Sequence, residues 1–489
     1  MLLTGYVQAS APGIVQLWVG VFGVAAPPAL QVSIDRQVAN PLAAPQFFPI
    51  RDFSVDGAGQ PVNHQCVLRF KVSDESRPRQ IRIDAGGESF EFASTSLPKA
   101  VPTLMDGSFN ILLSSCYSQP EDVNGLLGTI VSQIKVQPHL TVLAGDQVYL
   151  DQPLTQHVPD QNPDRARLLA NKYYLNWLSG ALRVPGLQAV LERAPVVCIP
   201  DDHEFWNNYP FAQKQLPDTW TDASRQLLGD TARALYEDYQ IGGAPGGAGG
   251  AIRLHIEPLM MLFVDMRCDR DSTFKSLMGP QAVAEMQAWE KDLVDAHAAG
   301  RPAVGLLASG QALFIDPPDT DWRKKTFDAE MPNYAQFDVL QATLGRLADN
   351  GIPVVYLTGD VHWGRVASGR DLQTGTALYE VISSPSRLIR VPFLDTAKEA
   401  VNAVKGIFGP RNAWPRHADP DPVPDRFGIN HRFAINQEFG HRGDQVAIVS
   451  FTRVGSGVDM QVSYYGISSD KTISQSVSTT RFELRARAN

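Results

Sequence analysis

The sequence predicts a layered α/β domain preceded by a small antiparallel β-sandwich. Residues 1 to about 100 contain short segments of alternating apolar and polar residues, whereas residues from 109 onward contain nearly continuous apolar runs separated by helical segments. Alternation is typical of strands with one exposed face, and continuous apolar runs are typical of strands buried on both faces. We therefore expect a sandwich domain at 1–100 and a second domain at 109–489, joined through the Pro- and Gly-containing segment 98–108.

The expected strands of the first region are rich in β-branched and aromatic residues, and turn signals such as Asp56–Gly59 separate them. They are Ile14–Phe22, Cys66–Val72, Gln80–Asp84 and Ser89–Phe92. Short strands with this pattern indicate an antiparallel sandwich.

The second region alternates between buried strands and helices. Its expected strands are Phe109–Leu113, Leu140–Ala144, Val196–Ile199, Leu259–Val264, Ala303–Leu307 and Val354–Leu357. Its expected helices include Arg165–Leu182, Thr219–Tyr239 and Gly279–His297. We expect residues 395–443 to be irregular and Val446–Arg487 to supply the last strands.

Composition restricts the class of protein. With 44% hydrophobic and 19% charged residues, the chain has the composition of a globular protein and not of a disordered one. Its net charge of −9 argues against a general affinity for nucleic acids or anionic membranes. Four cysteines are too few for a disulfide scaffold and too scattered for a structural zinc cluster, which suits a reducing compartment without excluding an extracellular one.

The N-terminus resembles a signal sequence only superficially. Its first charged residue is Asp35, so the basic n-region of a signal peptide is missing, and Gln16 interrupts the best apolar stretch, Ile14–Ala26. This stretch is also shorter than the roughly 20 residues of a membrane helix. We expect a soluble protein without a transmembrane segment, cytoplasmic or exported by a signal that is not visible, and leave its oligomeric state open.

Ionisable side chains follow five of the buried strands. In open α/β sheets ligands bind beyond the carboxyl ends of the strands, so residues at these positions are expected to share one pocket. The five segments are Ser115-Cys116-Tyr117, Gly145-Asp146-Gln147-Val148-Tyr149, Asp201-Asp202-His203-Glu204, Asp265-Met266-Arg267 and Gly359-Asp360-Val361-His362.

The residue types in these segments indicate metal chemistry. Carboxylates and imidazoles with few thiols suit hard or borderline metal ions, and two such ions can clamp a phosphoryl group and activate water. No Gly-x-Ser-x-Gly elbow lies at a strand end, and no Gly-x-Gly-x-x-Gly follows the first buried strand, which disfavours serine hydrolases and dinucleotide enzymes. The segment Gly242–Gly250 lacks the lysine and Ser/Thr of a phosphate-binding loop and is expected to be a connector.

The order of these motifs resembles that of the calcineurin-like metallophosphoesterases, and in detail the alkaline phosphatase D (PhoD-like) family. Asn207-Asn208 and Gly279-Pro280-Gln281 to Trp289 add to the resemblance, which covers nearly the whole chain. It implies a four-layer αββα metallophosphoesterase sandwich behind the small β-sandwich. It further implies a phosphoric ester hydrolase, a phosphomonoesterase or phosphodiesterase, that uses a binuclear metal centre and a metal-bound hydroxide.

The same resemblance assigns roles by position. Asp146 matches the carboxylate between the two metals, Cys116 and Tyr149 match ligands of a trivalent iron, and His203 with Asp202 matches the catalytic pair. The second ion is expected to be divalent: calcium, manganese or zinc. The implied metal ligands are Cys116, Asp146, Tyr149, Asp202, Asp360 and His362. Cys116 and Asp360 depart from the wider superfamily, which has Asp-x-His and Gly-His-x-His there, and this leaves the identity of the metals open.

Simpler interpretations stay open for several residues. Cys116 or Tyr149 alone is more often part of a core, and Arg267 can pair with Asp265 or Asp269. We predict substrate contacts for Asn208, Arg267 and Arg365.

The alternatives in function are a non-catalytic binding protein that retains the fold, or a phospholipase or cell-wall phosphodiesterase with the same site. The sequence does not select the natural substrate, the preference for mono- or diesters, or a role for the N-terminal sandwich.

Overall fold

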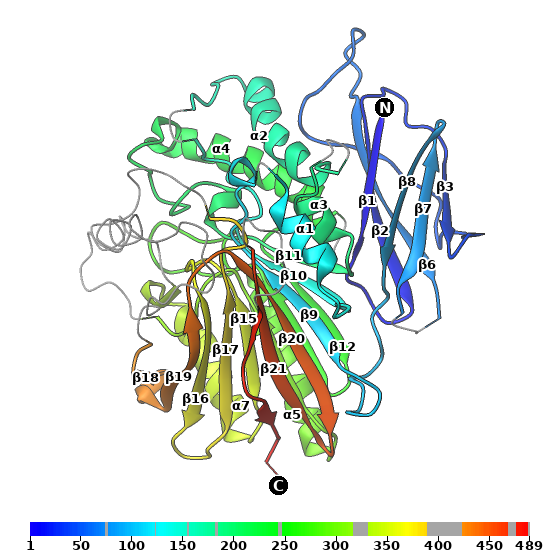
Figure 1. Ribbon diagram of the computed structural model, residues 1–489. Helices are drawn as coiled ribbons and strands as arrows, with labels where there is room; N and C mark the ends of the chain where they lie inside the picture. Colours follow the sequence, from blue (N-terminus) through cyan, green and yellow to red (C-terminus); the bar gives the residue numbers. More distant parts are fainter. Residues whose placement is uncertain are drawn as a thin grey trace.

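The structure is a computed structural model that describes residues 1–73, 77–122, 124–153, 156–180, 184–242, 247–315, 331–388, 423–467 and 476–487. Two large β-sheets pack face to face, and helices cover the outer face of each (Figure 1). This four-layer αββα arrangement, with a small β-sandwich at the N-terminus, confirms the expected fold class.

The first large sheet contains strands from both ends of the chain. Its centre is parallel, because β9 pairs with β10 and β10 with β11 in the same direction. In sheet order the strands are β22 (Ser476–Ser478), β21 (Gly457–Gly466), β20 (Gln445–Val454), β9 (Phe109–Ser114), β10 (Leu140–Ala144), β11 (Val196–Ile199), β1 (Leu2–Gln8), β2 (Ile14–Phe22), β6 (Asn63–Lys71) and β5 (Phe48–Pro49), with β23 (Phe482–Leu484) also on β21.

The second large sheet also has a parallel centre, formed by β13, β14, β15 and β17. Its strands in order are β12 (Ala251–Ile256), β13 (Leu259–Val264), β14 (Val304–Ala308), β15 (Val354–Thr358), β17 (Ala377–Ser383), β16 (Gly364–Asp371), β19 (Phe433–His441) and β18 (Arg426–Phe427). One face of each apolar run packs between the two sheets and the other face packs against the helices, which is why the runs do not alternate.

The helices form the two outer layers. Helices α1 (Leu126–Gln133), α2 (Asn162–Trp177), α3 (Leu187–Leu191) and α4 (Asp222–Tyr236) share a core with the first sheet. Helices α5 (Pro280–Ala298) and α7 (Phe337–Asp349) share a core with the second sheet. Sequence signals fix the helix starts, because Thr221 Oγ1 accepts the backbone N–H of Ser224 at 3.1 Å and Pro280 opens α5. A π-helical turn, Glu237–Ile241, continues α4.

The N-terminal sandwich shares strands with the first large sheet. Its second layer is a four-stranded sheet of β4 (Gln37–Val38), β3 (Leu30–Ile34), β7 (Arg79–Ala85) and β8 (Glu88–Ser94), which packs on β1, β2 and β6 through residues such as Leu17 and Ile83. Strand β1 pairs in parallel with β11 through Gln8 and Val196. The large sheet therefore runs directly into the sandwich (Figure 1). The domain limits 1–100 and 109–489 stay predictions.

One expectation about local structure was wrong, and parts of several expected segments lie outside the described residues. The segment 395–443, expected to be irregular, contains β18 and the nine-residue strand β19, which pairs with β16. Residues 395–422 of that segment lie outside the described residues, as do Leu182 at the end of an expected helix and 243–246 of the glycine-rich connector.

The glycine before Asp360 is required by close packing at the end of β15. A Cβ atom on Gly359 would lie 2.2 Å from Ser115 Oγ and 2.4 Å from the carbonyl oxygen of Ala144. Those neighbours belong to the β9 and β10 ends, so this contact sets how closely the two large sheets approach each other at the strand ends.

We expect Gly359→Ala to lower the free energy of unfolding by about 1–3 kcal/mol, because the added methyl group overpacks this contact. Gly57→Ala is the matched control, since a Cβ atom there meets nothing within 4 Å. Chemical denaturation of both variants measures the difference. Equal stability of the two variants would contradict the packing argument.

Candidate metal centre

Strand ends from both large sheets deliver the predicted site residues to one place. Cys116 lies two residues beyond β9, Asp146 two beyond β10, Asp202 three beyond β11 and Asp360 two beyond β15. The buried strands hold these ends at one edge of the two sheets, so residues more than 200 positions apart in the chain become neighbours.

The backbone at these positions is strained. Cys116, Asp146, Asn208, Asp360 and His362 all have positive φ values, between 53° and 64°. Non-glycine residues rarely adopt this left-handed conformation, which costs of the order of 1–3 kcal/mol and tends to cluster at functional sites. Cys116, Asp146 and Asp360 thus turn the chain directly after β9, β10 and β15.

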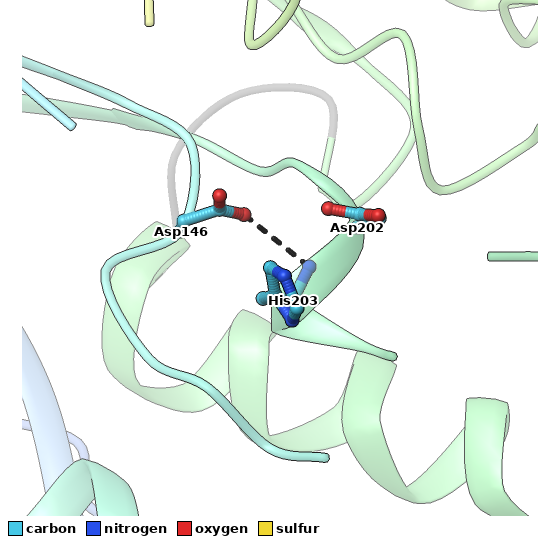
Figure 2. Close-up of side chains that lie close together, drawn as sticks. All are labelled: Asp146, Asp202 and His203. Atoms are coloured by element: carbon cyan, nitrogen blue, oxygen red, sulfur yellow. Dashed lines mark hydrogen bonds between the residues drawn. The ribbon is translucent and has the colours of Figure 1, made fainter. Parts of the chain in front are cut away.

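Two overlapping groups of side chains have the spacing of a metal site. Asp146, Asp202 and His203 each offer a ligand atom within 4.8 Å of the others, and so do Asp146, Asp201 and Asp360. Figure 2 shows the first group, in which the carboxylate of Asp146 also accepts the backbone N–H of His203 at 3.3 Å. Asp146 belongs to both groups and therefore lies between them.

Cys116 lies against the same carboxylates. Its sulfur is 3.3 Å from Asp146 Oδ2 and 3.5 Å from the carbonyl oxygen of Asp360, and Ser384 Oγ donates to it at 3.1 Å. Burial raises the pKa of the Cys116 thiol well above its ordinary value, and the neighbouring carboxylates raise it further. Without a cation the thiol is therefore protonated.

Three buried polar atoms at this cluster show whether its residues fit a bound cation. The hydroxyl of Tyr149, Oδ1 of Asn208 and Oδ2 of Asp201 are buried and have no hydrogen-bond partner among the described residues. A buried polar atom without a partner is costly and needs an explanation such as an ion. Oxygen, sulfur and imidazole donors together suit a trivalent or divalent cation, so the residues fit the implied metals.

His203 is held by a carboxylate that the sequence analysis did not single out. Its Nδ1 lies 2.8 Å from Asp151 Oδ1, and its ring centre is 4.2 Å from that of Tyr149. Asp151 in turn accepts the N–H of Asn207 at 3.0 Å. Burial lowers the pKa of His203, but the surrounding carboxylates, led by Asp151, raise it well above its ordinary value.

Burial also sets the protonation of the other carboxylates. It raises the pKa of Asp146 well above the ordinary value, with His203 opposing this shift. The pKa of Asp202 is lowered overall. Burial would raise it, but the nearby charges of His203 and Arg267 outweigh the effect of burial. Without a cation, burial and the neighbouring carboxylates therefore favour the protonated form of Asp146, and a bound cation would favour its ionised form.

The comparison with solved structures identifies the fold. The solved structure of PhoD matches with a TM-score of 0.60 at 14% sequence identity, over 99% of this chain and 90% of that one. The chain has a PhoD-like fold. GAP50, the anchor in the inner membrane complex of Plasmodium, matches at a TM-score of 0.34 and 8% identity, over 78% of this chain and 90% of that one. The Thermus thermophilus protein TT1561 matches at a TM-score of 0.23 and 10% sequence identity, over 57% of this chain and 90% of that one.

Neither the protein-family models nor the curated proteins gave a match to this sequence. The PhoD-like fold therefore rests on the comparison of structures. Among the described residues, no helix is both long enough and apolar enough to cross a bilayer.

Glu204 connects two of the PhoD-like strand ends, although the sequence analysis gave it no role. Its fully buried carboxylate accepts the backbone N–H groups of Asp146, Gln147 and Asp201 at 2.9, 2.7 and 2.8 Å. The side chain of Gln240, on the π-helical turn, donates to the same carboxylate at 3.2 Å. Burial raises the pKa of Glu204 to about 7, while these donors oppose the shift.

The two arginines predicted to contact substrate are both buried in ion pairs. Arg267 Nε donates to Asp201 at 2.7 Å, and Arg365 Nη2 donates to Glu380 at 2.6 Å. The side chain of Arg267 thus pairs with Asp201, whereas Asp265 accepts its backbone N–H. Contact of either arginine with substrate stays a prediction, and these ion pairs do not support it.

The remaining predicted residues lie at or beside the cluster. The N–H of Asn208 donates to Asp202 Oδ2 at 2.6 Å, which leaves its side-chain oxygen facing no described partner. The N–H of His362 donates to Ser384 Oγ at 3.2 Å, and Ser384 also contacts Cys116. The metal-ligand roles of these residues stay predictions.

Several residues of the cluster were missed by sequence reasoning. Asp201 belonged to a quoted motif and had no assigned role. Asp151 lies two positions beyond Tyr149, and its position just after the Gly-Asp motif was the signal that could have found it. Arg270, fully buried near Asp201 with its pKa lowered to about 10 by burial and by Arg267, carried no recognisable signal.

We expect Glu204→Gln to lower the free energy of unfolding by about 2–5 kcal/mol. In either amide orientation the new NH2 group faces two N–H donors, which then lack an acceptor. Glu192→Gln is a matched control, because Glu192 accepts a bond from Gln188, at 3.0 Å, and an amide oxygen can replace it. Denaturant unfolding compares the two variants. Wild-type stability of Glu204→Gln would refute the role of Glu204 in joining the loops.

Proposed function

We propose that this protein is a metal-dependent phosphoric ester hydrolase of the PhoD-like type. The observation that carries the proposal is that Asp146 has ligand spacing to Asp202 in one group of side chains and to Asp360 in another, at strand ends of a PhoD-like fold. A carboxylate common to two groups is the arrangement that a binuclear centre needs, since one residue must face both ions.

The ligands proposed for the two ions are Cys116, Asp146, Tyr149, Asp202, Asp360 and His362. The resemblance to the PhoD-like family implies a trivalent iron beside Cys116 and Tyr149, and the oxygen-rich remainder suits a divalent ion, calcium, manganese or zinc. When bound, the cations would neutralise charge on the phosphoryl oxygens and lower the pKa of water.

His203 is proposed as the proton donor to the leaving oxygen. Because Nδ1 faces Asp151, the other ring nitrogen is the one able to reach a substrate. The surrounding carboxylates, led by Asp151, favour the protonated ring, since they raise the pKa of His203. The side chain is 13% exposed, so it is held in place and remains open to a ligand.

Asp202 is proposed to fix the turn that presents His203. The turn Asp202–Glu204 is a short helix held by a capping box between Asp201 and Glu204. The carboxylate of Asp202 also accepts the N–H of Asn208, and this bond supports the proposal that the Asn208 side chain contacts substrate.

We expect metal-replete protein to hydrolyse p-nitrophenyl phosphate or bis-p-nitrophenyl phosphate. A chelator should abolish turnover, and metal addition should restore it. Asp146→Asn should lower kcat by at least about 100-fold, because it removes the charge common to both ligand groups. Colorimetric assays with elemental analysis measure both effects, and the relative rates on the two esters report the preference for mono- or diesters.

Asp230→Asn, an exposed carboxylate on α4, is the control and should retain wild-type turnover. Absence of turnover on both esters and on phospholipid analogues, with metal content confirmed, would favour a binding protein that retains the fold. Turnover of the phospholipid analogue alone would favour the phospholipase alternative.

We also expect iron(III)-loaded protein to show a visible absorption band that Tyr149→Phe removes. The band arises from charge transfer between a tyrosinate and the iron, so it requires the Tyr149 oxygen as a ligand. Tyr173→Phe is the matched control, because the Tyr173 hydroxyl is also buried without a described partner but belongs to the core beside α4. A band that persists in Tyr149→Phe would remove Tyr149 from the ligand set.

A further inference from the structure

One lysine is bound to the turn that carries Tyr149 and Asp151. The ammonium group of Lys172, on α2, donates to the carbonyl oxygens of Tyr149, Leu150 and Gln152 at 3.2, 2.6 and 2.5 Å. Three carbonyls of one turn converge on one cation, which uses all three of its N–H bonds. Such a turn is a specific cradle for an ammonium group.

This placement is costly for a lysine. The side chain is only partly exposed, and burial lowers the pKa of Lys172 to about 8, with Asp151 opposing the shift. Lysines normally keep their charged end in water. The three carbonyl contacts offset the loss of hydration, so the fold holds the charge here instead of at the surface.

The turn presents two side chains to the candidate centre. The ring of Tyr149 packs against the ring of His203, and the carboxylate of Asp151 holds the same histidine at 2.8 Å. The backbone of Leu150 also donates to the carbonyl oxygen of His203 at 3.0 Å. A shift of this turn by about 1 Å would therefore displace a ligand and the partner of the proton donor together.

Helix α2 holds the preceding part of the loop as well. Asn176, one helical turn after Lys172, donates to the carbonyl oxygen of Gln147 at 2.7 Å. The two side chains lie on one face of the helix, because residues four positions apart are neighbours there. Glu204 binds the N–H groups at the start of the loop, and α2 binds its carbonyl groups.

We propose that Lys172 is a positioning residue, which fixes the turn Tyr149–Gln152 so that Tyr149 faces the candidate metal centre and Asp151 holds His203. The inference deepens the proposed function, but its structural part does not depend on hydrolysis. The three carbonyl contacts distinguish Lys172 from surface lysines that serve only for solubility.

Amide hydrogen exchange tests the structural part. In Lys172→Met, which keeps the length of the side chain without donors, the segment 147–153 should exchange about 10-fold faster than in wild type. Lys291→Met is the matched control, since Lys291 is an exposed helical lysine paired with Asp295, and it should leave this segment unchanged. Equal exchange of 147–153 in the two variants would overturn the proposal.

Lys172→Arg provides a second variant if Lys172→Met fails to fold. Its planar fork keeps the charge but does not converge on three carbonyls, so exchange at 147–153 should still rise while the remaining segments stay protected. Wild-type protection of 147–153 in Lys172→Arg, combined with wild-type turnover, would overturn the proposal.

Turnover tests the link to the reaction. Lys172→Met should lower kcat about 10–100-fold and leave KM within about 2-fold of the wild-type value. In the background of Asp151→Asn, Lys172→Met should lower kcat little further, because both changes act through His203. Additive losses would show that Lys172 does not act through Asp151. If the wild-type protein cleaves no ester while exchange still rises in Lys172→Met, the proposed hydrolysis fails and the positioning role stands.

Discussion

The candidate centre depends on bringing together carboxylates that repel one another. Four buried carboxylates lie beyond the ends of three strands: Asp146, Asp201, Asp202 and Asp360. In a medium of low dielectric constant like charges at this spacing interact strongly, so the fold must hold them against repulsion. Arg267 neutralises Asp201, and His203 faces Asp146 and Asp202. The rest of the charge is left for cations.

The backbone around the cluster shows how this repulsion is withstood. The left-handed residues after β9, β10 and β15 are strained, and strained loops persist only where their surroundings determine them. Two side chains determine the loop after β10: the buried Glu204 binds N–H groups at its start, and the partly exposed Lys172 binds carbonyl groups at its end. The loop therefore cannot relax to separate Asp146 from its neighbours.

The sequence predicted those parts that depend on local pattern. Strands β10, β11 and β13 begin and end where their apolar runs do, because burial on both faces requires apolar residues throughout. The residues that follow these runs lie at the cluster for the same reason. Sequence position relative to a strand was thus enough to find Asp146, Asp202, His203 and Asp360.

Contacts between distant segments were not predictable in this way. Nothing near Gln8 indicates that β1 pairs with β11, which lies far along the chain at Val196. Arg267 had two acidic neighbours in sequence, yet its side chain pairs with Asp201, because β13 ends beside β11 in space and Asp269 pairs with Arg233. Strand β19 was missed because its residues do not alternate cleanly and its pairing with β16 supplies the pattern.

The pairing of β1 with β11 gives the N-terminal sandwich a physical connection to the candidate centre. Side chains of β1 and β2 bind the carbonyl groups of the π-helical turn Glu237–Ile241: Tyr6 and Trp18 donate to Tyr239 and Asp238 at 2.8 and 2.9 Å, and Gln8 donates to Ile241 at 2.7 Å. Such π-helical turns are rare and are frequent at functional sites. The same turn carries Gln240, which binds the carboxylate of Glu204. The chain of contacts therefore runs from the N-terminal strands through the π-turn to the residue that joins the β10 and β11 loops, so the sandwich contributes to holding the carboxylates in place.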